Sequence, residues 1–315
     1  MTPEAREYHV DRIFADFFSY LHDHDMSDNT IRGYRTDLEI FADWFRETNG
    51  KNVTLHTITP TDIRAYKQFL RTVAKQNPNT VNRKLSALFS LSSWAVSSER
   101  IKSSFTTDID LLKKEKLAPR ALTKQEEGRL LREAEELVAL AETKTDPARI
   151  QAVRDLSIIK MLLNTGLRIS ELCDLDLGDV VLTPKTGHLI VRAGKGDKPG
   201  EVPLNSLARR AIRDWLAVRP KSLSTRLFIS RRSSVRDEGI TPSAVQRRFT
   251  IIGRRANVEV SPHDLRHTFA TRLRERHVAD VIIKELMRLE TMEMVAHYSR
   301  PNEHDLEVSV DQLVG

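Results

Sequence analysis

The sequence predicts a mainly helical protein with a small antiparallel β-sheet, divided into an N-terminal helical bundle and a mixed α/β second domain. Its length of 315 residues suits two domains. Apolar residues recur at helical spacing through most of the chain. Two short strand-like segments, 187–192 and 200–204, flank the turn sequence GKGDK, which is typical of a β-hairpin.

The first domain is expected over residues 1–102, as a bundle of four or five helices. Asp28 or Asn29 is the candidate cap of its second helix. The third helix has a stronger start signal, because Thr59 is followed by a proline that fits the first turn and by Asp62, three residues on.

A polar, lysine-rich linker is expected over 103–117, and the second domain over 118–315. A capping box at 123–126 opens the second domain. Its further helices are expected over 154–165, 205–218, 242–256, 262–276 and 279–288.

The composition favours a polyanionic partner. Fifty lysines and arginines against 44 acidic residues give a formal net charge of +6, and basic side chains displace counterions from phosphates. No apolar run approaches the roughly 18 residues of a membrane span, and the N-terminus lacks a signal pattern, so we expect a cytoplasmic protein. The single cysteine, Cys173, predicts neither a disulfide framework nor a cysteine-rich zinc site.

Five residues form a candidate catalytic set for phosphodiester cleavage: Arg168, Lys195, His263, Arg266 and Tyr298. Two guanidiniums suit the non-bridging oxygens of a phosphate, because each offers a planar fork of donors. A lysine can protonate a leaving 5′ oxygen, and a histidine can accept or hold a proton. Nearby positive charge favours the phenolate of a tyrosine, whose phenol alone is a poor nucleophile.

Each member also has an ordinary structural interpretation. Arg168 could simply pair with Glu171 three residues later on a helix, which taken alone is the simpler interpretation. Lys195 could be a solvated turn lysine, and Tyr298 a packing residue.

The spacing of His263 and His267 superficially resembles a zinc site. The residues between them are Asp-Leu-Arg and include no glutamate base, and no further ligand is evident in the sequence. We therefore predict no metal and no cofactor.

Four segments resemble the catalytic boxes of the tyrosine recombinases, the family of phage integrases and Xer-type resolvases. An N-terminal segment, 30–38 (TIRGYRTDL), resembles the family's core-binding domain. The resemblance covers nearly the whole chain, and the boxes occur in the family's order. They are 165–172 (TGLRISEL), 191–198 (VRAGKGDK) with the later 202–204 (VPL), 261–271 (SPHDLRHTFAT) and 292–299 (MEMVAHYS).

The resemblance implies a role for each member of the set. Arg168 and Arg266 would bind the scissile phosphate, and Lys195 would protonate the 5′ oxygen. His263 would assist proton transfer, and Tyr298 would attack to form a 3′-phosphotyrosine. The covalent bond conserves energy, so rejoining would need neither ATP nor a metal.

It also assigns supporting residues and an assembly. Glu171 would position its neighbours, His267 would pack or orient, and Lys198 is the fallback for Lys195. Four protomers would act on two duplex DNA sites, each with paired inverted binding sequences, and exchange strands through a Holliday junction. Accessory DNA-bending proteins are possible partners, and the tail after Tyr298 could dock on a neighbouring protomer or on its own domain.

Leu289 departs from the family pattern. Members usually carry Leu-Gly-His, or tryptophan in place of that histidine, nine residues before the tyrosine, and here that position is Leu289. Loss of one transition-state donor commonly costs about 10²–10³ in rate. The activity could be slower or lost, or Arg288, His297 or another donor could replace the missing one. We expect retained activity, and a Leu289→His variant that cleaves faster.

Candidate DNA contacts lie near the start of the fourth helix, where polar and basic side chains cluster. They are Asn79, Thr80, Arg83 and Lys84. The alternative interpretation of the same residues is an ordinary solvated face.

Two other functions remain open at this point. A type IB topoisomerase could use a similar set of side chains to relax supercoils, although the N-terminal resemblance and the small size argue against it. A DNA-binding regulator that has lost catalysis is the second, and Leu289 is the feature that supports it.

Overall fold

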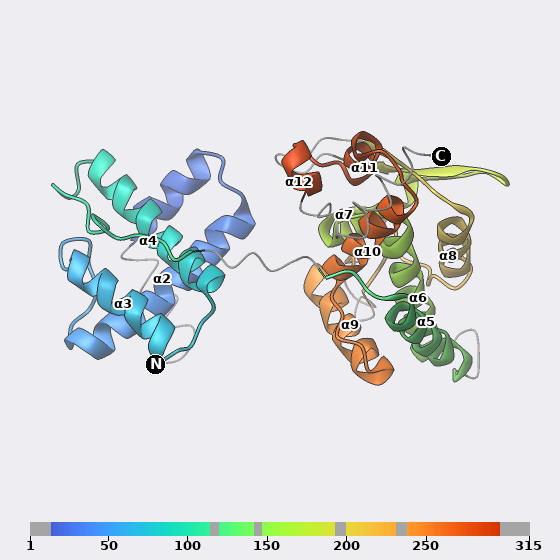
Figure 1. Cartoon of the computed structure of the whole chain (residues 1–315), viewed down its shortest axis with the longest axis horizontal. Coiled ribbons are helices and arrows are strands. Elements are labelled where there is room, and N and C mark those ends of the chain that lie inside the picture. The colour runs from blue at the N-terminus through green and yellow to red at the C-terminus, as the bar shows by residue number, and fades with distance from the viewer. Residues whose placement is uncertain (1–13, 114–119, 142–146, 193–199, 231–237, 297–315) are drawn as a thin grey trace, which may run out of the picture. The chain divides into compact units, whose positions relative to one another are not determined.

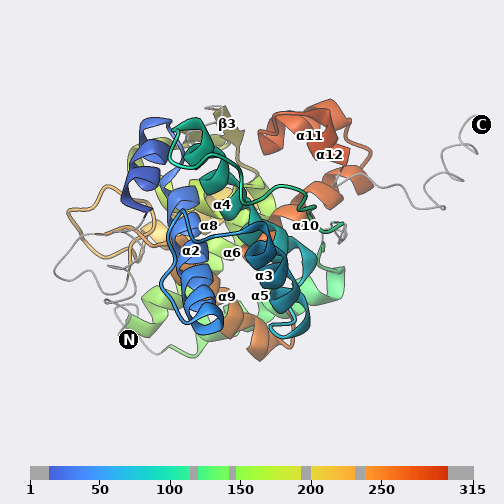
Figure 2. The same ribbon diagram turned by 90° about the vertical axis from the view of Figure 1, so that its left-hand side faces the viewer.

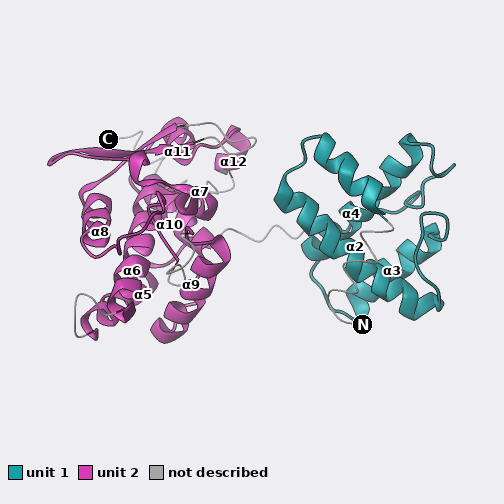
Figure 3. Cartoon of the chain, turned by 180° about the vertical axis from the view of Figure 1, so that it is seen from behind, with its two compact units in different colours: residues 1–117 teal, residues 118–315 magenta. Residues whose placement is uncertain are grey.

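The computed structural model describes residues 14–113, 120–141, 147–192, 200–230 and 238–296. The chain divides into two compact units, residues 1–117 and 118–315 (Figure 3). The described residues are mainly helical with one three-stranded antiparallel sheet, which confirms the predicted fold class. None of the helices in these ranges is both long enough and apolar enough to cross a membrane.

The N-terminal unit is a bundle of helices (Figure 1). Residues 14–23 are helical, and three longer helices follow: α2 (Asp28–Asn49), α3 (Pro60–Thr72) and α4 (Pro78–Ser97). The capping box predicted at the start of α3 is present, because Thr59 and Asp62 each accept a hydrogen bond from the other's backbone N–H.

The predicted cap of α2, Asp28 or Asn29, was wrong by one or two residues. Its N-cap is Ser27, which is extended and whose hydroxyl accepts a hydrogen bond from the backbone N–H of Thr30. Asp28 and Asn29 therefore belong to the first turn of α2, where an acidic side chain is also favoured.

Aromatic side chains hold α2 against α3. The ring of Tyr66 lies edge-on to Phe41 at a centroid distance of 5.1 Å, and 5.0 Å from the ring of Trp44. All three side chains are buried. Truncating a buried aromatic residue of this kind typically costs about 3–5 kcal/mol, so these contacts fix the two helices relative to each other.

Part of the segment predicted as a linker, 103–117, packs into the N-terminal unit instead. Phe105 and Ile109 are buried in its hydrophobic core. The Asn82 side chain makes hydrogen bonds to both backbone groups of Leu112. It donates to the carbonyl oxygen and accepts from the N–H, at 2.8 Å each. A buried amide with paired donor and acceptor gives the segment a fixed path that its polar composition did not reveal.

The C-terminal unit is built around α6 (Pro147–Thr165), of whose side chains more than half are buried. Three helices pack against it: α5 (Lys124–Ala139), α8 (Ser206–Leu216) and α10 (Pro262–Glu275). α9 (Pro242–Ala256) completes this layer by packing on α5 (Figure 1). The bounds of α9 match the sequence prediction, and α6 begins seven residues earlier than predicted.

The sheet has the order β1-β2-β3, with β2 (Gly187–Val191) in the centre. β2 and β3 (Gly200–Pro203) form the predicted hairpin, and its last paired residues are Val191 and Gly200. β1 (Val180–Leu182), which follows the short 3-10 helix η1 (Leu177–Asp179), was not predicted. Three residues are too few for an alternating pattern to be recognised.

The last described helices, α11 (Asp280–Met287) and α12 (Met292–Ala296), lie side by side in both views of the chain (Figures 1 and 2). With α10 they enclose a small core of their own, separate from the main core of the unit. Its buried members are Ala270, Ile283, Met287, Leu289 and Val295.

Cys173, the single cysteine, is buried in the main core of the C-terminal unit. Burial raises the pKa of its thiol to about 12, with the nearby Asp174 acting in the same direction. A thiol of this kind is chemically inert at neutral pH.

Candidate active site

The site begins at the turn between α6 and α7 (Ile169–Asp174). Gly166 has φ +62°, a conformation that disfavours any side chain, and a Cβ there would lie 2.5 Å from a ring carbon of Phe269. The turn therefore needs glycine for two independent reasons. It places Arg168 at the N-cap of α7, where its side chain is 27% exposed.

Glu171 is the carboxylate at which the candidate guanidiniums meet. Its Oε1 accepts a hydrogen bond from the Arg168 guanidinium at 3.0 Å, and its Oε2 accepts from the Arg168 backbone N–H at 2.6 Å. Oε2 also accepts from the Arg288 guanidinium at 2.5 Å and lies 4.0 Å from Arg266 Nη1. The Glu171 side chain is only 7% exposed, so these charges act on one another with little screening by water.

Arg266 comes from α10 and is buried. Its guanidinium donates to the carbonyl oxygens of Gly166 at 2.5 Å and of Met287 at 2.7 Å. These bonds join the α6–α7 turn, α10 and the end of α11. The structure thus brings Arg168 and Arg266 to one carboxylate, although they lie on different helices.

His263 lies in the first turn of α10, which a capping box between Ser261 and Asp264 opens. Burial lowers the pKa of His263, and the positive charges of Arg266 and Arg168 lower it further, against the opposing effect of Asp264. His263 is therefore neutral at pH 7 and has a lone pair able to accept a proton.

His267 packs edge-on against His263, with ring centroids 4.2 Å apart. It is buried, and burial lowers its pKa to about 4, with His263 acting in the same direction. This environment fits the packing or orienting role that the sequence predicts for His267 better than a reactive one.

Leu289, the residue that departs from the family pattern, is buried in the small core of α10, α11 and α12. Its side chain therefore contributes packing. The preceding residue, Arg288, is the C-cap of α11 in a left-handed conformation, and its guanidinium is the one that reaches Glu171. Sequence reasoning named Arg288 only as one of several possible substitute donors, because nothing in the sequence shows which way this side chain points.

Several candidates lie outside the described residues: Lys195, its fallback Lys198, His297 and the nucleophile candidate Tyr298. The structure describes the elements next to these residues in the chain. The hairpin that carries Lys195 is paired up to Val191 and Gly200, and α12, which precedes Tyr298, ends at Ala296.

Of the candidate DNA contacts on α4, Asn79 and Arg83 are exposed and Thr80 is half-buried. Lys84 is not available, because its side chain is 4% exposed and its ammonium pairs with the buried carboxylate of Asp37 at 3.2 Å. Lys84 follows the exposed Arg83 but lies on the buried face of the helix. The sequence prediction did not distinguish the exposed face from the buried face at Lys84.

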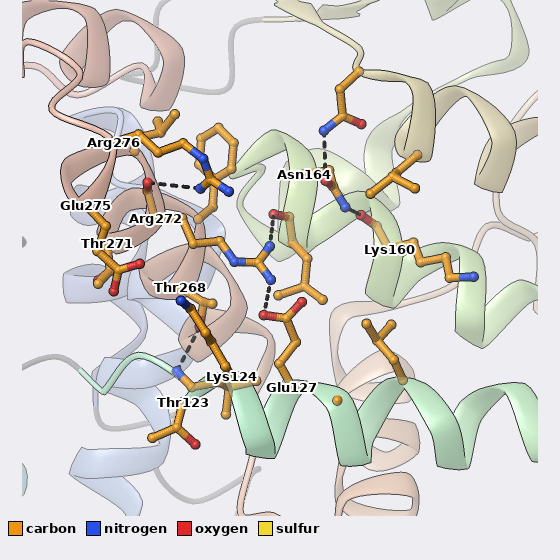
Figure 4. Close-up of a pocket in the computed structure, with 18 of the residues that line it drawn as sticks. Thr123, Lys124, Glu127, Lys160, Asn164, Thr268, Thr271, Arg272, Glu275 and Arg276 are labelled. Carbon is orange, nitrogen blue, oxygen red and sulfur yellow. Dashed lines mark hydrogen bonds and ion pairs between the residues drawn. The ribbon is translucent and has the colours of Figure 1, made fainter.

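A cavity of about 1060 Å³ lies elsewhere in the C-terminal unit, between α5, α6 and α10 (Figure 4). Two ion pairs lie in its lining: Arg272 with Glu127, and Lys160 with Glu135 at 2.8 Å. None of the arginines and histidines of the candidate site lines it, so this cavity is distinct from the site.

Comparison with known proteins places both units in one family. Residues 122–305 match the Phage integrase family, and residues 14–99 match the Phage integrase, N-terminal SAM-like domain. Tyrosine recombinase XerC of Thermodesulfovibrio yellowstonii is 32% identical over 284 residues, which cover 86% of this chain and 86% of the relative. Tyrosine recombinase XerA of Pyrococcus furiosus is 28% identical over 300 residues, 95% of this chain and 93% of the relative.

The fold is also shared with a solved DNA complex. The Tn1549 transposon integrase in complex with a circular intermediate DNA has a TM-score of 0.68 at 18% identity, covering 96% of this chain and 99% of that one.

Proposed function

We propose the function of this chain from its family, which these matches establish. The chain belongs to the phage integrase family of tyrosine recombinases. It is a DNA-cleaving and rejoining enzyme of site-specific recombination. In the proposed mechanism, Tyr298 attacks a DNA phosphate and forms a 3′-phosphotyrosine intermediate, and strands are exchanged through a Holliday junction. The observation that supports it most is the convergence of Arg168 and Arg266 on Glu171.

In the proposed reaction, the Tyr298 phenol oxygen forms a bond to phosphorus and the bond to the 5′ oxygen breaks. The phenolic proton passes to neutral His263, and Lys195 supplies a proton to the leaving oxygen. Arg168 and Arg266 offset the negative charge that develops on the non-bridging oxygens. Rejoining reverses these steps, so the bond energy is retained and no ATP is consumed.

The proposed substrate is duplex DNA carrying paired inverted binding sequences, with both units gripping the duplex as a clamp. Arg83, Asn79 and Thr80 would contact DNA from α4. The proposal includes four protomers on two sites, action in the cytoplasm, and accessory DNA-bending proteins where a site requires them. DNA in the solved complex of the Tn1549 transposon integrase supports this substrate class.

The test is covalent trapping on a nicked suicide substrate made from DNA that flanks the gene. The wild-type chain is expected to give an adduct that survives denaturing electrophoresis. Tyr298→Phe should lose the adduct and still bind DNA, and Tyr34→Phe, a half-buried tyrosine of the N-terminal unit, is the matched control.

Other outcomes separate the competing functions. An adduct that persists in Tyr298→Phe would contradict the assignment of the nucleophile. DNA binding without any wild-type adduct would favour a regulator. Relaxation of any supercoiled plasmid, without recombinants between two defined sites, would favour a topoisomerase.

A further inference from the structure

We propose that Arg288 is a positioning residue of the recombination site. By pairing with Glu171 it adds positive charge to the site, which compensates for the hydrogen-bond donor that Leu289 lacks. This inference rests on the proposed function. It concerns a residue that the catalytic set does not contain.

The backbone at Arg288 is the first observation. Arg288 has φ +51°, in the left-handed region that favours glycine. Six other non-glycine residues in the described ranges share a positive φ, and all six are exposed. Arg288 differs, because its side chain is only 6% exposed. A strained backbone conformation and a buried charge at the same residue indicate a functional constraint at this position.

The contacts of the Arg288 side chain explain where the charge goes. One nitrogen, Nη2, donates to Glu171 Oε2 at 2.5 Å, and Nη1 donates to the Leu286 carbonyl at 3.3 Å. Nε is buried and has no hydrogen-bond partner within the described part of the chain. The stem lies against the start of β3, since a Cβ at Gly200 would be 3.3 Å from Arg288 Cδ. Arg288 thus links the end of α11 to the carboxylate and to the hairpin.

The charge balance gives this contact a consequence for chemistry. Glu171 alone would offset much of the positive charge of Arg168 and Arg266, to both of which it is close. With Arg288 added, three guanidiniums share one carboxylate, and the formal charge of the cluster rises from +1 to +2. The two phosphate-binding guanidiniums then keep more of their attraction for a negatively charged phosphorane.

The experiment compares two suicide substrates, one with the normal phosphate and one with a methylphosphonate at the scissile position. The methylphosphonate is uncharged, so it needs less positive charge from the protein. Arg288→Gly is expected to slow adduct formation by about 10- to 100-fold on phosphate and by much less on methylphosphonate. Arg288→Lys, which keeps the charge without the planar fork, should fall between wild type and Arg288→Gly on phosphate.

Arg288→Gly should fold, because glycine adopts φ +51° without strain. The matched control is Arg248→Gln, since Arg248 pairs with the buried Asp155 at 2.6 Å, in an ion pair that includes neither Glu171 nor the arginines near it. This control should change both substrates by the same factor. An Arg288→Gly defect of equal size on both substrates, or no defect on phosphate, would overturn the inference and leave the proposed function standing.

A second measurement covers the case in which the wild type forms no adduct and the proposed function fails. Inorganic phosphate should raise the thermal unfolding temperature of the wild type more than that of Arg288→Gly, because binding to the folded state stabilises it. Equal shifts in the two proteins would reject the charge role of Arg288 independently of cleavage.

Discussion

The guanidinium of Arg266 donates a hydrogen bond to the carbonyl oxygen of Gly166, a residue one hundred positions earlier in the chain. This bond joins the turn that presents Arg168 to the helix that presents His263. The two arginine boxes are therefore one structural unit, in which the shape of a glycine turn sets the position of a guanidinium.

Gly166→Ala is expected to disrupt that unit. The positive φ and the contact of the new Cβ with Phe269 together should cost about 2–4 kcal/mol of unfolding free energy. Urea unfolding measures the loss. Gly178→Ala is the control, because a Cβ at Gly178 meets no atom within 4 Å, and it should change stability by about 0.5 kcal/mol or less. Equal losses in the two variants would contradict the role of the turn.

Leu289→His and Arg288→Gly should be coupled if Arg288 compensates for the missing donor. Leu289→His alone is expected to raise the rate of adduct formation, and at this buried position to lower stability by about 1–3 kcal/mol. In that background Arg288→Gly should cost less rate than in the wild type. A double-mutant cycle measures the coupling, and strictly additive effects on the logarithm of the rate would argue against compensation.

Stability should fall on acidification because of His267. Its pKa is about 4 when folded and about 6.5 when unfolded, so the unfolded chain binds the extra proton between these values. The stabilisation is complete above pH 6.5 and is lost as the pH falls toward 4, by up to about 3 kcal/mol. Urea unfolding at pH 7 and pH 5 tests this, and His267→Gln should reduce the slope. The same slope in His267→Gln would show that other groups cause it.

Arg83 and Lys84 are neighbours that both pair with Asp37, but only the exposed Arg83 should affect DNA binding. Arg83→Ala should weaken binding and reduce the salt dependence by about one phosphate contact. Because the exposed guanidinium of Arg83 also pairs with Asp37, this variant should lose some stability as well, but less than Lys84→Ala. Lys84→Ala should instead lower the unfolding free energy by about 2 kcal/mol, because Asp37 loses a buried partner. Salt-dependent binding and urea unfolding distinguish them, and a larger binding defect in Lys84→Ala would reverse this assignment.

The elements that sequence predicted well are those with local signals. The start of α3 follows from the Thr59 cap, the bounds of α9 from an apolar face that begins at a proline, and the hairpin from its glycine-rich turn. Each signal lies within a few residues, so it can be recognised without knowing which distant segments come into contact.

The features that sequence did not predict depend on contacts between distant segments. The path of residues 103–113 is fixed by Asn82, which reads in the sequence as an ordinary polar helix residue. Lys84 is buried only because Asp37 faces it from another helix. The link between Arg288 and Glu171 spans 117 positions, and it requires a left-handed backbone conformation that arginine rarely adopts. Composition and periodicity carry no information about such pairings.

The burial of Cys173 has a practical consequence for following how this protein assembles. Its thiol is the only one in the chain, lies in the core and stays protonated at neutral pH. A cysteine introduced at an exposed position would therefore react with a maleimide dye almost alone, without prior removal of the native thiol. Donor and acceptor dyes attached in this way would report the distance between subunits during synapsis.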